Sequence, residues 1–437
     1  MVVTSPLPVQ RLATLSPQRR REILDRAGSH VFDPTVQAAA AAALRAVRER
    51  GDAALVEYTE IFDGVRLAPD RLAVPAEEIA EAPGRIGSGL RAALREAIDR
   101  ARRYNERLLP RSWLEPLEPG ITAGVRFTPI AGVGVYIPSG KGTFPSTAVT
   151  ILTPAVVAGV DPIVVVVPPR ADGSIDPAVL AVCALVGVRR VIRCNGVAGV
   201  AALAVGTPTV PAMPAVVGPG NPYVTATQLL AQTAGTRVLA LLGPTEAVIL
   251  ADGGADPRRV ALDLISEAEH GAESAALLVT DSAALAAAVA AAVPALLGGL
   301  PPERARFAEA AIVRNGGIFL AETMDDAAAF VDAFAPEHLL IVAANPRQLL
   351  DRIRHAGEIL LGAWSPFSAA NYAIGVPAAL PTGRAARAAS GITVLSFLKA
   401  SSVAELDADG LRRLRPAVEA LGTYEGFPAH VRAVVER

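Results

Sequence analysis

The strongest hydrophobic signal in the chain is an uninterrupted apolar run at residues 162–168, which reads Pro-Ile-Val-Val-Val-Val-Pro. An apolar run without polar alternation is typical of a strand buried on both faces, as in a parallel sheet. Similar runs at residues 132–138, 190–194 and 215–217 predict further strands, and residues 177–186 predict a helix among them. This alternation predicts a mostly parallel sheet with helices on both sides.

A second series of apolar runs follows the first one along the chain. It comprises residues 247–251, 274–280, 317–320 and 338–342. The hydrophobic pattern therefore predicts an α/β fold with two Rossmann-like, parallel-sheet lobes.

The two ends of the chain have a different pattern. Residues 16–125 interleave charged residues with Leu and Ala, which predicts helices with one buried face, most clearly at residues 90–109. Residues after about 390 are more polar and predict a short helical tail. The predicted domains are an N-terminal helical region packing with the second lobe (1–128), a first lobe (129–243), a second lobe (244–388) and the tail (389–437).

Composition and charge narrow the function. The 437 residues include 41 basic and 43 acidic ones, and this balance gives no electrostatic basis for binding nucleic acid or a membrane surface. Two cysteines are too few for a disulfide framework or a multi-cysteine zinc site, and they suit a reducing compartment. Neither a secretory signal nor an apolar tract of membrane-spanning length is evident. We therefore expect a cytoplasmic protein.

The most informative chemical motif is the phrase Phe-Ala-Pro-Glu-His-Leu at residues 334–339. It places a carboxylate, Glu337, beside an imidazole, His338, in a chain with only five histidines. Glu and His are the usual pair for moving protons near neutral pH. An isolated His at the start of an apolar strand is more often a buried structural residue. The functional interpretation of His338 therefore depends on the whole surrounding phrase.

Two further motifs could bind ligands. Gly-Pro-Gly-Asn at residues 218–221 follows a predicted strand, and glycines there let backbone N–H groups approach an anionic ligand. Taken alone, this string is more often a plain turn. Glu267 and His270 lie three residues apart on one predicted helix face, a spacing that could chelate a metal. The alternative is that they are ordinary polar residues.

Together with the phrase Glu-Gly-Phe-Pro-Ala-His at residues 425–430, these motifs resemble the histidinol dehydrogenase family over nearly the whole chain. The resemblance implies a homodimer in which the C-terminal tail crosses to the partner's active site. It also implies NAD-dependent oxidation of an alcohol, coupled to a second oxidation to the acid. In that chemistry His338 takes the alcohol proton and Glu337 activates water.

The resemblance also implies further site residues and a zinc ion. The implied cofactor contacts are Tyr136 and Asn221. The implied zinc ligands are Glu267, His270, Asn371 and His430. The implied substrate contacts are Thr245, Glu267, His270, His338, Asn371, Glu425 and His430.

Some of the positions that the family uses are changed in this chain. Asn371 stands where the family has Asp, and Glu267 where it has Gln, so the total ligand charge is kept. Ala378 stands where the family has a substrate-recognising His, and Ala198 where it has a cofactor-contacting Gln. Because leaving a buried polar group unpaired costs about 1–3 kcal/mol, the loss of a partner for the imidazole argues against histidinol.

The leading functional hypothesis is therefore NAD-dependent oxidation of a small polar or amino alcohol, with histidinol itself disfavoured. The first alternative is a genuine L-histidinol dehydrogenase of histidine biosynthesis. The others are a family member that has lost redox chemistry and binds a ligand, and an enzyme that uses Glu337 and His338 for non-redox proton transfer.

Overall fold

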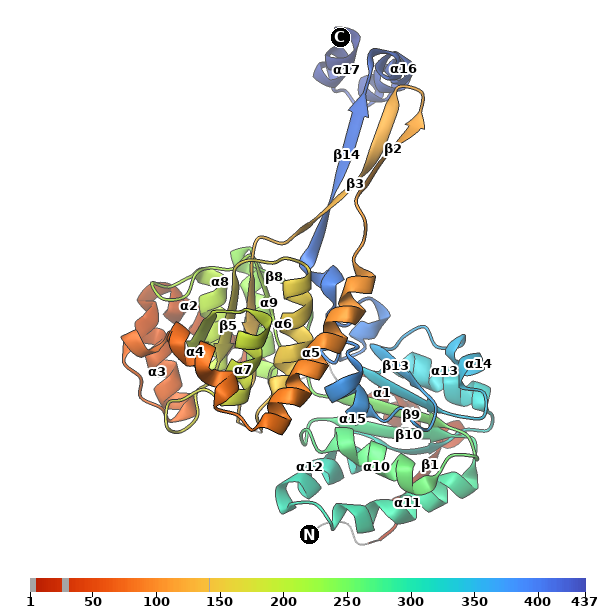
Figure 1. The fold of residues 1–437 in the computed structure, drawn as a ribbon. Coiled ribbons are helices and arrows are strands. Elements are labelled where there is room, and N and C mark those ends of the chain that lie inside the picture. The colour runs from red at the N-terminus through yellow and green to blue at the C-terminus, as the bar shows by residue number, and fades with distance from the viewer. Residues whose placement is uncertain (1–4, 26–30, 141) are drawn as a thin grey trace.

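The computed structural model describes residues 5–25, 31–140 and 142–437 and shows two α/β lobes with a long projecting arm (Figure 1). The first lobe is built on a parallel five-stranded sheet with the order β6-β5-β4-β7-β8. Its strands are β4 (Val133–Tyr136), β5 (Ile163–Val167), β6 (Arg190–Arg193), β7 (Ala215–Val217) and β8 (Arg237–Val238).

Helices cover both faces of this sheet. One face carries α5 (Ser88–Leu108), α6 (Pro145–Val157) and α7 (Pro177–Val186), and the short α4 (Ala76–Glu81) packs against α7. The other face carries α2 (Pro34–Arg50), α3 (Asp52–Asp63), α8 (Gly196–Val205) and α9 (Pro222–Ala231). Val165 and Val167 face the first helical layer, while Val164 and Val166 face the second. The run of β5 is continuously apolar because both of its faces are buried.

The second lobe has a parallel six-stranded sheet with the order β1-β11-β10-β9-β12-β13. Its strands are β1 (Val9–Arg11), β9 (Glu246–Ala251), β10 (Ala275–Thr280), β11 (Gly317–Leu320), β12 (His338–Val342) and β13 (Glu358–Leu361). Helices α10 (Pro257–Ala268), α11 (Ala283–Leu297) and α12 (Pro302–Val313) cover one face, and α1 (Pro17–Leu24), α13 (Met324–Phe334) and α14 (Pro346–Leu350) lie on the other.

The N-terminal region, expected to pack with the second lobe, divides its packing between the two lobes. Strand β1 adds an edge to the second sheet, whereas α2 and α3 lie on α8 and α9 of the first lobe. The buried face of α2 includes Ala40, Ala43 and Val47. Small side chains let this helix approach the Ala-rich α8 closely, which accounts for its position.

The arm is a three-stranded antiparallel sheet that ends in two helices (Figure 1). Strands β2 (Trp113–Glu118) and β3 (Ile121–Pro129) pair with β14 (Leu398–Leu406), and α16 (Ala408–Tyr424) and α17 (Pro428–Val435) follow. The sequence predicted helix before residue 125 and only helix in the tail, so these strands were missed. Every residue of β2 is exposed, and such a strand lacks the apolar alternation that would reveal it.

The prediction of an α/β fold with Rossmann-like parallel sheets is confirmed. The exchange of the tail between two chains stays a prediction. Among the described residues, no helix combines the length and the apolar character needed to cross a membrane.

Candidate active site

Apart from Glu425 and His430, the predicted site residues lie near the carboxyl edge of the first sheet and the amino edge of the second. In the first lobe, Tyr136 is the last residue of β4 and the Gly-Pro-Gly-Asn loop at residues 218–221 follows β7. In the second lobe, Thr245 precedes β9 and His338 begins β12. Gly220 N–H donates to the Leu242 carbonyl at 3.3 Å, which ties the loop after β7 to the segment entering β9. Gly243 N–H, in that segment, donates to Thr382 Oγ1 at 2.7 Å. The carboxyl edge of one sheet thus faces the amino edge of the other.

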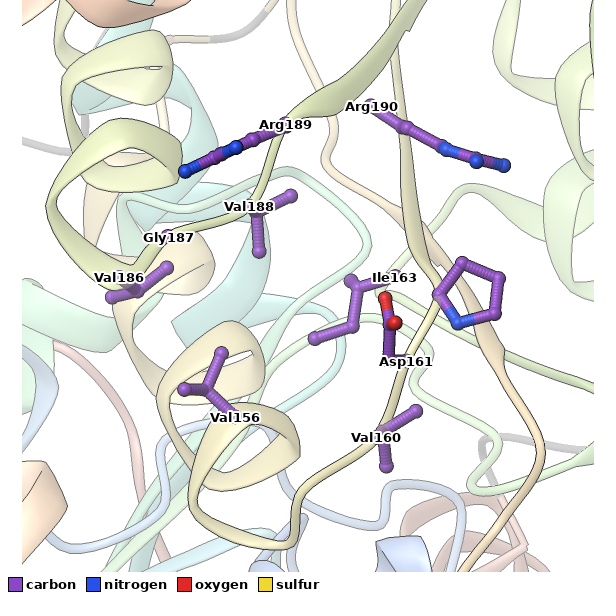
Figure 2. Close-up of a pocket in the computed structure, with 10 residues that line it drawn as sticks. Val156, Val160, Asp161, Ile163, Val186, Gly187, Val188, Arg189 and Arg190 are labelled. Atoms are coloured by element: carbon purple, nitrogen blue, oxygen red, sulfur yellow. The ribbon is translucent and has the colours of Figure 1, made fainter.

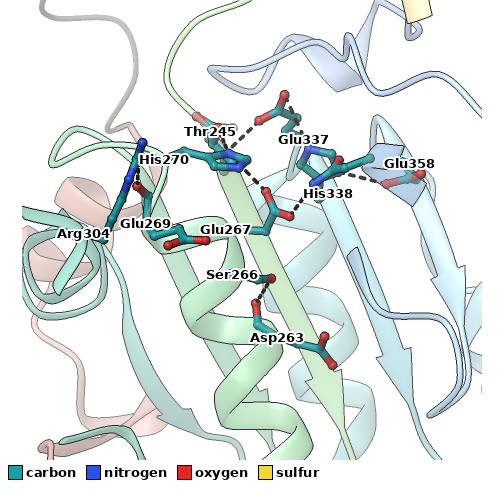
Figure 3. A network of polar contacts seen from close by, with 12 residues as sticks. Thr245, Asp263, Ser266, Glu267, Glu269, His270, Arg304, Glu337, His338 and Glu358 are labelled. Atoms are coloured by element: carbon teal, nitrogen blue, oxygen red, sulfur yellow. Dashed lines mark hydrogen bonds and ion pairs between the residues drawn. The ribbon is translucent and has the colours of Figure 1, made fainter. Parts of the chain in front are cut away.

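His338 is buried and held on several sides. Its Nδ1 lies 2.9 Å from Glu358 Oε2, and its Nε2 lies 3.7 Å from Glu337 Oε1 (Figure 3). The Phe367 ring lies edge-on to the imidazole, with ring centroids 5.9 Å apart. The imidazole therefore has a defined orientation, with one nitrogen bound to Glu358 and the other beside Glu337.

Glu337 is also buried and fixed by the backbone. The Glu246 N–H donates to its Oε2 at 2.9 Å. Burial raises the pKa of the Glu337 carboxyl to about 8, although the neighbouring His338 opposes the shift. Ala335, two residues earlier, has a φ of 53°, a left-handed conformation that is uncommon for Ala. The turn into β12 is therefore locally strained where it delivers Glu337 and His338, as is frequent at functional sites.

The electrostatics around His338 favour its protonated form. Burial alone would lower the pKa of this imidazole, but the carboxylates of Glu337, Glu267 and Glu358 outweigh burial and raise it. The same carboxylates would stabilise an imidazolium produced by proton abstraction. The arrangement suits a group that has to accept a proton.

A second polar cluster surrounds the end of α10 (Figure 3). Glu267 Oε1 accepts a 2.7 Å hydrogen bond from Asn371 Nδ2, and Asn371 belongs to the π-helical turn Ala370–Ile374 that follows α15 (Phe367–Ala369). His270 Nδ1 lies 3.1 Å from Thr245 Oγ1 and 3.5 Å from Glu267 Oε2. The structure thus brings four predicted residues from three segments into one network.

The described residues contain no group of three or more His, Cys, Asp or Glu side chains placed to hold a metal ion. Within one chain, the predicted set reduces to Glu267, His270 and the amide of Asn371. The buried Glu267 Oε2 has no hydrogen-bond partner among the described groups, and a bound cation would satisfy it. The local donors are therefore compatible with a metal but need a further ligand from outside this cluster.

The tail residues Glu425 and His430 lie away from this cluster. Both are exposed, at the end of α16 and in α17, at the tip of the projecting arm (Figure 1). One chain alone does not bring His430 to Glu267 and His270. Its role as a ligand requires a second chain and stays a prediction.

A cavity of about 430 Å³ lies elsewhere in the first lobe (Figure 2). It is lined by the ends of α6 and α7 and by the amino ends of β5 and β6, including Asp161, Arg189 and Arg190. Tyr136 and the Gly-Pro-Gly-Asn loop lie at the carboxyl ends of the strands of this sheet, so the cavity lies at the opposite edge. None of the predicted site residues lines it.

The relationship to known proteins follows from sequence and structure together. The sequence model of a family described as histidinol dehydrogenase matches residues 28–437, which is nearly the whole chain. The chain belongs to the histidinol dehydrogenase family. The family's members are NAD-dependent oxidoreductases, so the predicted enzyme class holds at this level.

Individual histidinol dehydrogenases and their homologues support the assignment. A protein from Colwellia psychrerythraea named histidinol dehydrogenase homolog is 40% identical, over 99% of this chain and 97% of that protein. A histidinol dehydrogenase from Synechocystis sp. is 39% identical, over 98% of each. The crystal structure of histidinol dehydrogenase from Elizabethkingia anophelis has a TM-score of 0.91 at 29% identity, covering 96% of both chains.

The two residues that the family resemblance assigns to the cofactor have defined structural roles here. Tyr136 is buried, and its ring packs so closely on Gly196 that a Cβ there would lie 2.7 Å from the phenol. Asn221 is exposed and caps α9, its Oδ1 accepting from the N–H groups of Tyr223 and Val224. The cap orders the amino terminus of α9 beside the glycine loop, and contact of either residue with NAD stays a prediction.

Sequence reasoning missed Glu358, Glu246 and Phe367. Glu358 lies twenty residues from His338 along the chain and meets it only through the pairing of β12 with β13. Glu246 contributes its backbone N–H to Glu337, and its Oε1 accepts from Gly383 N–H at 2.9 Å. The only sequence signal was a Glu at the start of an apolar strand, which has no meaning until the strand order is known.

Proposed function

We propose that this protein is an NAD-dependent alcohol dehydrogenase in which His338 is the proton acceptor. The observation that carries the proposal is the geometry of His338, bound through Nδ1 to Glu358 and surrounded by carboxylates. His338 Nε2 would remove the hydroxyl proton of the substrate as the carbinol carbon loses hydride. NAD, when bound, accepts that hydride.

Glu337 is suited to a second oxidation step. Its raised pKa, close to neutral, allows it to take a proton from water near physiological pH. Attack of that water on the aldehyde would give the hydrate. Transfer of a second hydride from the hydrate to a second NAD, with release of a hydroxyl proton, would give the acid. The hydrogen bond from Glu246 N–H keeps the Glu337 carboxyl in place for this step.

L-Histidinol is the substrate that the comparisons favour. The Synechocystis relative carries the name histidinol dehydrogenase without qualification and aligns over 98% of both chains. The chain keeps Glu337, His338 and His270, which the family uses. This support is stronger than the support for the general amino-alcohol hypothesis, so we place histidinol first.

Another small polar or amino alcohol remains the second candidate, and a specific observation favours it. Ala378 stands where the family has a His that recognises the substrate, and a methyl side chain offers no hydrogen bond to an imidazole. The Colwellia relative is named a homolog rather than a histidinol dehydrogenase. A substrate without an imidazole would not need that partner.

We also propose that zinc binds at Glu267 and His270, with Asn371 and, from a second chain, His430. The orphaned Glu267 Oε2 supports this proposal, since a cation there would compensate a buried charge. Asn371→Asp should tighten zinc binding because a carboxylate is a stronger ligand than a neutral amide. Metal analysis and competition with a chelator would measure this; unchanged affinity in the variant would remove Asn371 from the ligand set.

The test of function is NADH formation by the purified protein with L-histidinol and with a panel of small amino and polar alcohols. Reduction with histidinol, together with rescue of a histidine-requiring strain, would support the first candidate. Reduction only with other alcohols would support the second. Absence of reduction with every substrate, in protein that binds NAD and zinc, would contradict the dehydrogenase proposal and favour a binding or non-redox role.

A further inference from the structure

Glu358 faces His338 across two neighbouring parallel strands. The register of the sheet pairs His338, the first residue of β12, with Glu358, the first residue of the edge strand β13. Paired residues of adjacent strands project to the same face, so the two side chains meet there. The contact is the 2.9 Å hydrogen bond between Nδ1 and Oε2 that Figure 3 shows.

The Glu358 side chain has no other hydrogen bond among the described residues. It is 8% exposed, and its second oxygen, Oε1, is buried without a partner. Burying a carboxylate with one hydrogen bond is unfavourable, because water would satisfy both oxygens. A purely structural position would be served better by an apolar residue, so the side chain is best explained by its effect on His338.

The backbone of this segment is held independently of the Glu358 carboxylate. Glu358 N–H donates to the Glu337 carbonyl at 2.9 Å, and Gly357 N–H donates to the Pro336 carbonyl at 2.9 Å. Neither bond uses the Glu358 side chain, so both are kept in Glu358→Gln and Glu358→Leu. Changing that side chain therefore tests the contact with His338 while leaving the strand pairing in place.

We propose that Glu358 is a positioning residue that fixes the ring orientation and the tautomer of His338. This inference rests on the proposed dehydrogenase function. An ionised carboxylate only accepts hydrogen bonds, so in the neutral imidazole, the form that acts as the base, Nδ1 carries the proton that is donated to Glu358 and Nε2 keeps its lone pair. Nε2 is the nitrogen beside Glu337, where the substrate hydroxyl would have to lie. Without Glu358, the neutral imidazole could adopt the other tautomer or rotate, and fewer molecules would hold a base in position.

The experiment compares Glu358→Gln and Glu358→Leu with the wild type. Gln keeps an acceptor for the Nδ1 proton but removes the charge, whereas Leu removes both. The control is Ile359→Ala, because Ile359 packs on the opposite face of β13, away from His338. The rate of hydride transfer in a single turnover, KM, and the ¹⁵N and ¹H signals of the histidine ring are measured, with His338→Asn identifying the His338 signals.

We expect hydride transfer to slow by about 10–100-fold in Glu358→Leu and by less in Glu358→Gln, with KM within about 3-fold of the wild type. The strongly hydrogen-bonded Nδ1–H signal should disappear in Glu358→Leu and persist in Ile359→Ala. An unchanged His338 signal in a folded Glu358→Leu protein, or a rate within about 2-fold of wild type, would overturn the proposal. If Glu358→Leu does not fold, Glu358→Ala, which also removes the acceptor, takes its place, and a wild-type rate with an unaltered Nδ1–H signal in that variant would overturn the proposal.

The two arms of the experiment separate this inference from the proposed function. If no alcohol is oxidised by the wild type, the dehydrogenase proposal fails, and the ring signals alone still decide whether Glu358 sets the tautomer of His338. If the wild type oxidises an alcohol and the ring signals do not respond to Glu358, only the positioning proposal fails.

Discussion

At the scale of single residues, the environment of the candidate proton-transfer pair, Glu337 and His338, is set by side chains that lie far from the pair in the sequence. Glu337 and His338 are adjacent, and their phrase is recognisable without a structure. Glu358 could not be predicted, because nothing in the sequence says that β13 pairs with β12 rather than with another strand. Carboxylates brought together by strand order and helix packing therefore set the electrostatics of His338, and these are non-local properties of the fold.

The first prediction concerns His338 itself. His338→Asn should lower turnover by about 10²–10⁴-fold, the usual effect of losing a general base, while Asn fits the space and leaves the fold intact. Steady-state NADH formation measures the effect, with thermal unfolding as the check on folding. As a control, substitution of an exposed residue outside the site, Asp281→Asn, should keep wild-type turnover. Near-normal turnover in folded His338→Asn would show that another group accepts the proton.

The second prediction is a pH dependence of stability at Asp263, one turn before Glu267 on α10. Burial raises the pKa of Asp263 to about 6, and Glu267 adds to the shift. Since the folded-state pKa lies above the unfolded value, ionisation destabilises the folded protein as pH rises from about 4 to 6, and the full cost persists above pH 6. For this half-buried group the cost is about 1 kcal/mol after solvent screening.

Asp263→Asn should therefore raise the unfolding midpoint of chelator-treated protein at pH 7.5, by roughly 1–2 °C, with a smaller difference toward pH 4.5. Thermal unfolding monitored by circular dichroism at both pH values gives the comparison. The exposed Asp281→Asn should show no such pH-dependent gain. A stabilisation of equal size at both pH values would mean that relief of an ionised carboxylate is not its cause.

At the scale of elements, buried strands were predictable and exposed ones were not. Strand β5 was predictable because both of its faces are buried and its sequence is therefore continuously apolar. By contrast, β2 and most of β14 are exposed on both faces, so their residues follow no apolar period. The partner of β14 is also distant in sequence, since Leu406 pairs with Ile121 of β3. A hydrophobic period arises because one face of an element is buried, so an element that is exposed within its own chain has no such period in its sequence.

The third prediction concerns how α16 is fixed to the arm. Gly120, in the turn between β2 and β3, has a φ of 81°, and a Cβ on Gly410 would lie 2.0 Å from its carbonyl oxygen. The close approach therefore requires glycine at residue 410. Gly410→Val should displace α16 from the arm and abolish activity, while the two lobes keep their unfolding midpoint.

Activity and thermal unfolding of Gly410→Val are measured together with Gly422→Ala as a milder change within the same helix. A Cβ at Gly422 would meet the movable Val431 side chain at 2.7 Å rather than a backbone atom, so a smaller loss is expected. Full activity in Gly410→Val would show that the position of α16 does not matter for the site.

At the scale of the whole molecule, the arm is the feature that one chain does not explain. It projects from the two lobes (Figure 1). Its exposed large apolar side chains include Trp113, Leu117, Val403 and Tyr424. Several large apolar side chains exposed on a projecting arm are unfavourable in water and are typical of an interface. The proposed zinc site also lacks one of its ligands within one chain, and the histidine proposed for that place, His430, lies on the same arm.

A dimer that exchanges its arms would account both for the exposed apolar side chains and for the missing zinc ligand. The arm of each chain would be covered by the partner, and His430 and Glu425 would complete the partner's site. Symmetry requires that both exchanges occur together in a closed two-fold dimer. The assembly is proposed from exposure and incomplete ligation, which are consequences of the fold that sequence patterns do not reveal.

The last prediction tests this exchange by complementation. In a mixed dimer of His338→Asn and His430→Ala chains, one site has the intact His338 of the second chain and receives the intact tail of the first. The other site carries both substitutions. Random assortment of equal amounts makes about half of the dimers mixed, each with one functional site, so about one quarter of wild-type activity should return after joint refolding. Each variant refolded alone should stay inactive. If the jointly refolded mixture is no more active than its parents, although mixed dimers are detected by differential tags, His430 serves its own chain or none, and the arm does not complete the partner's site.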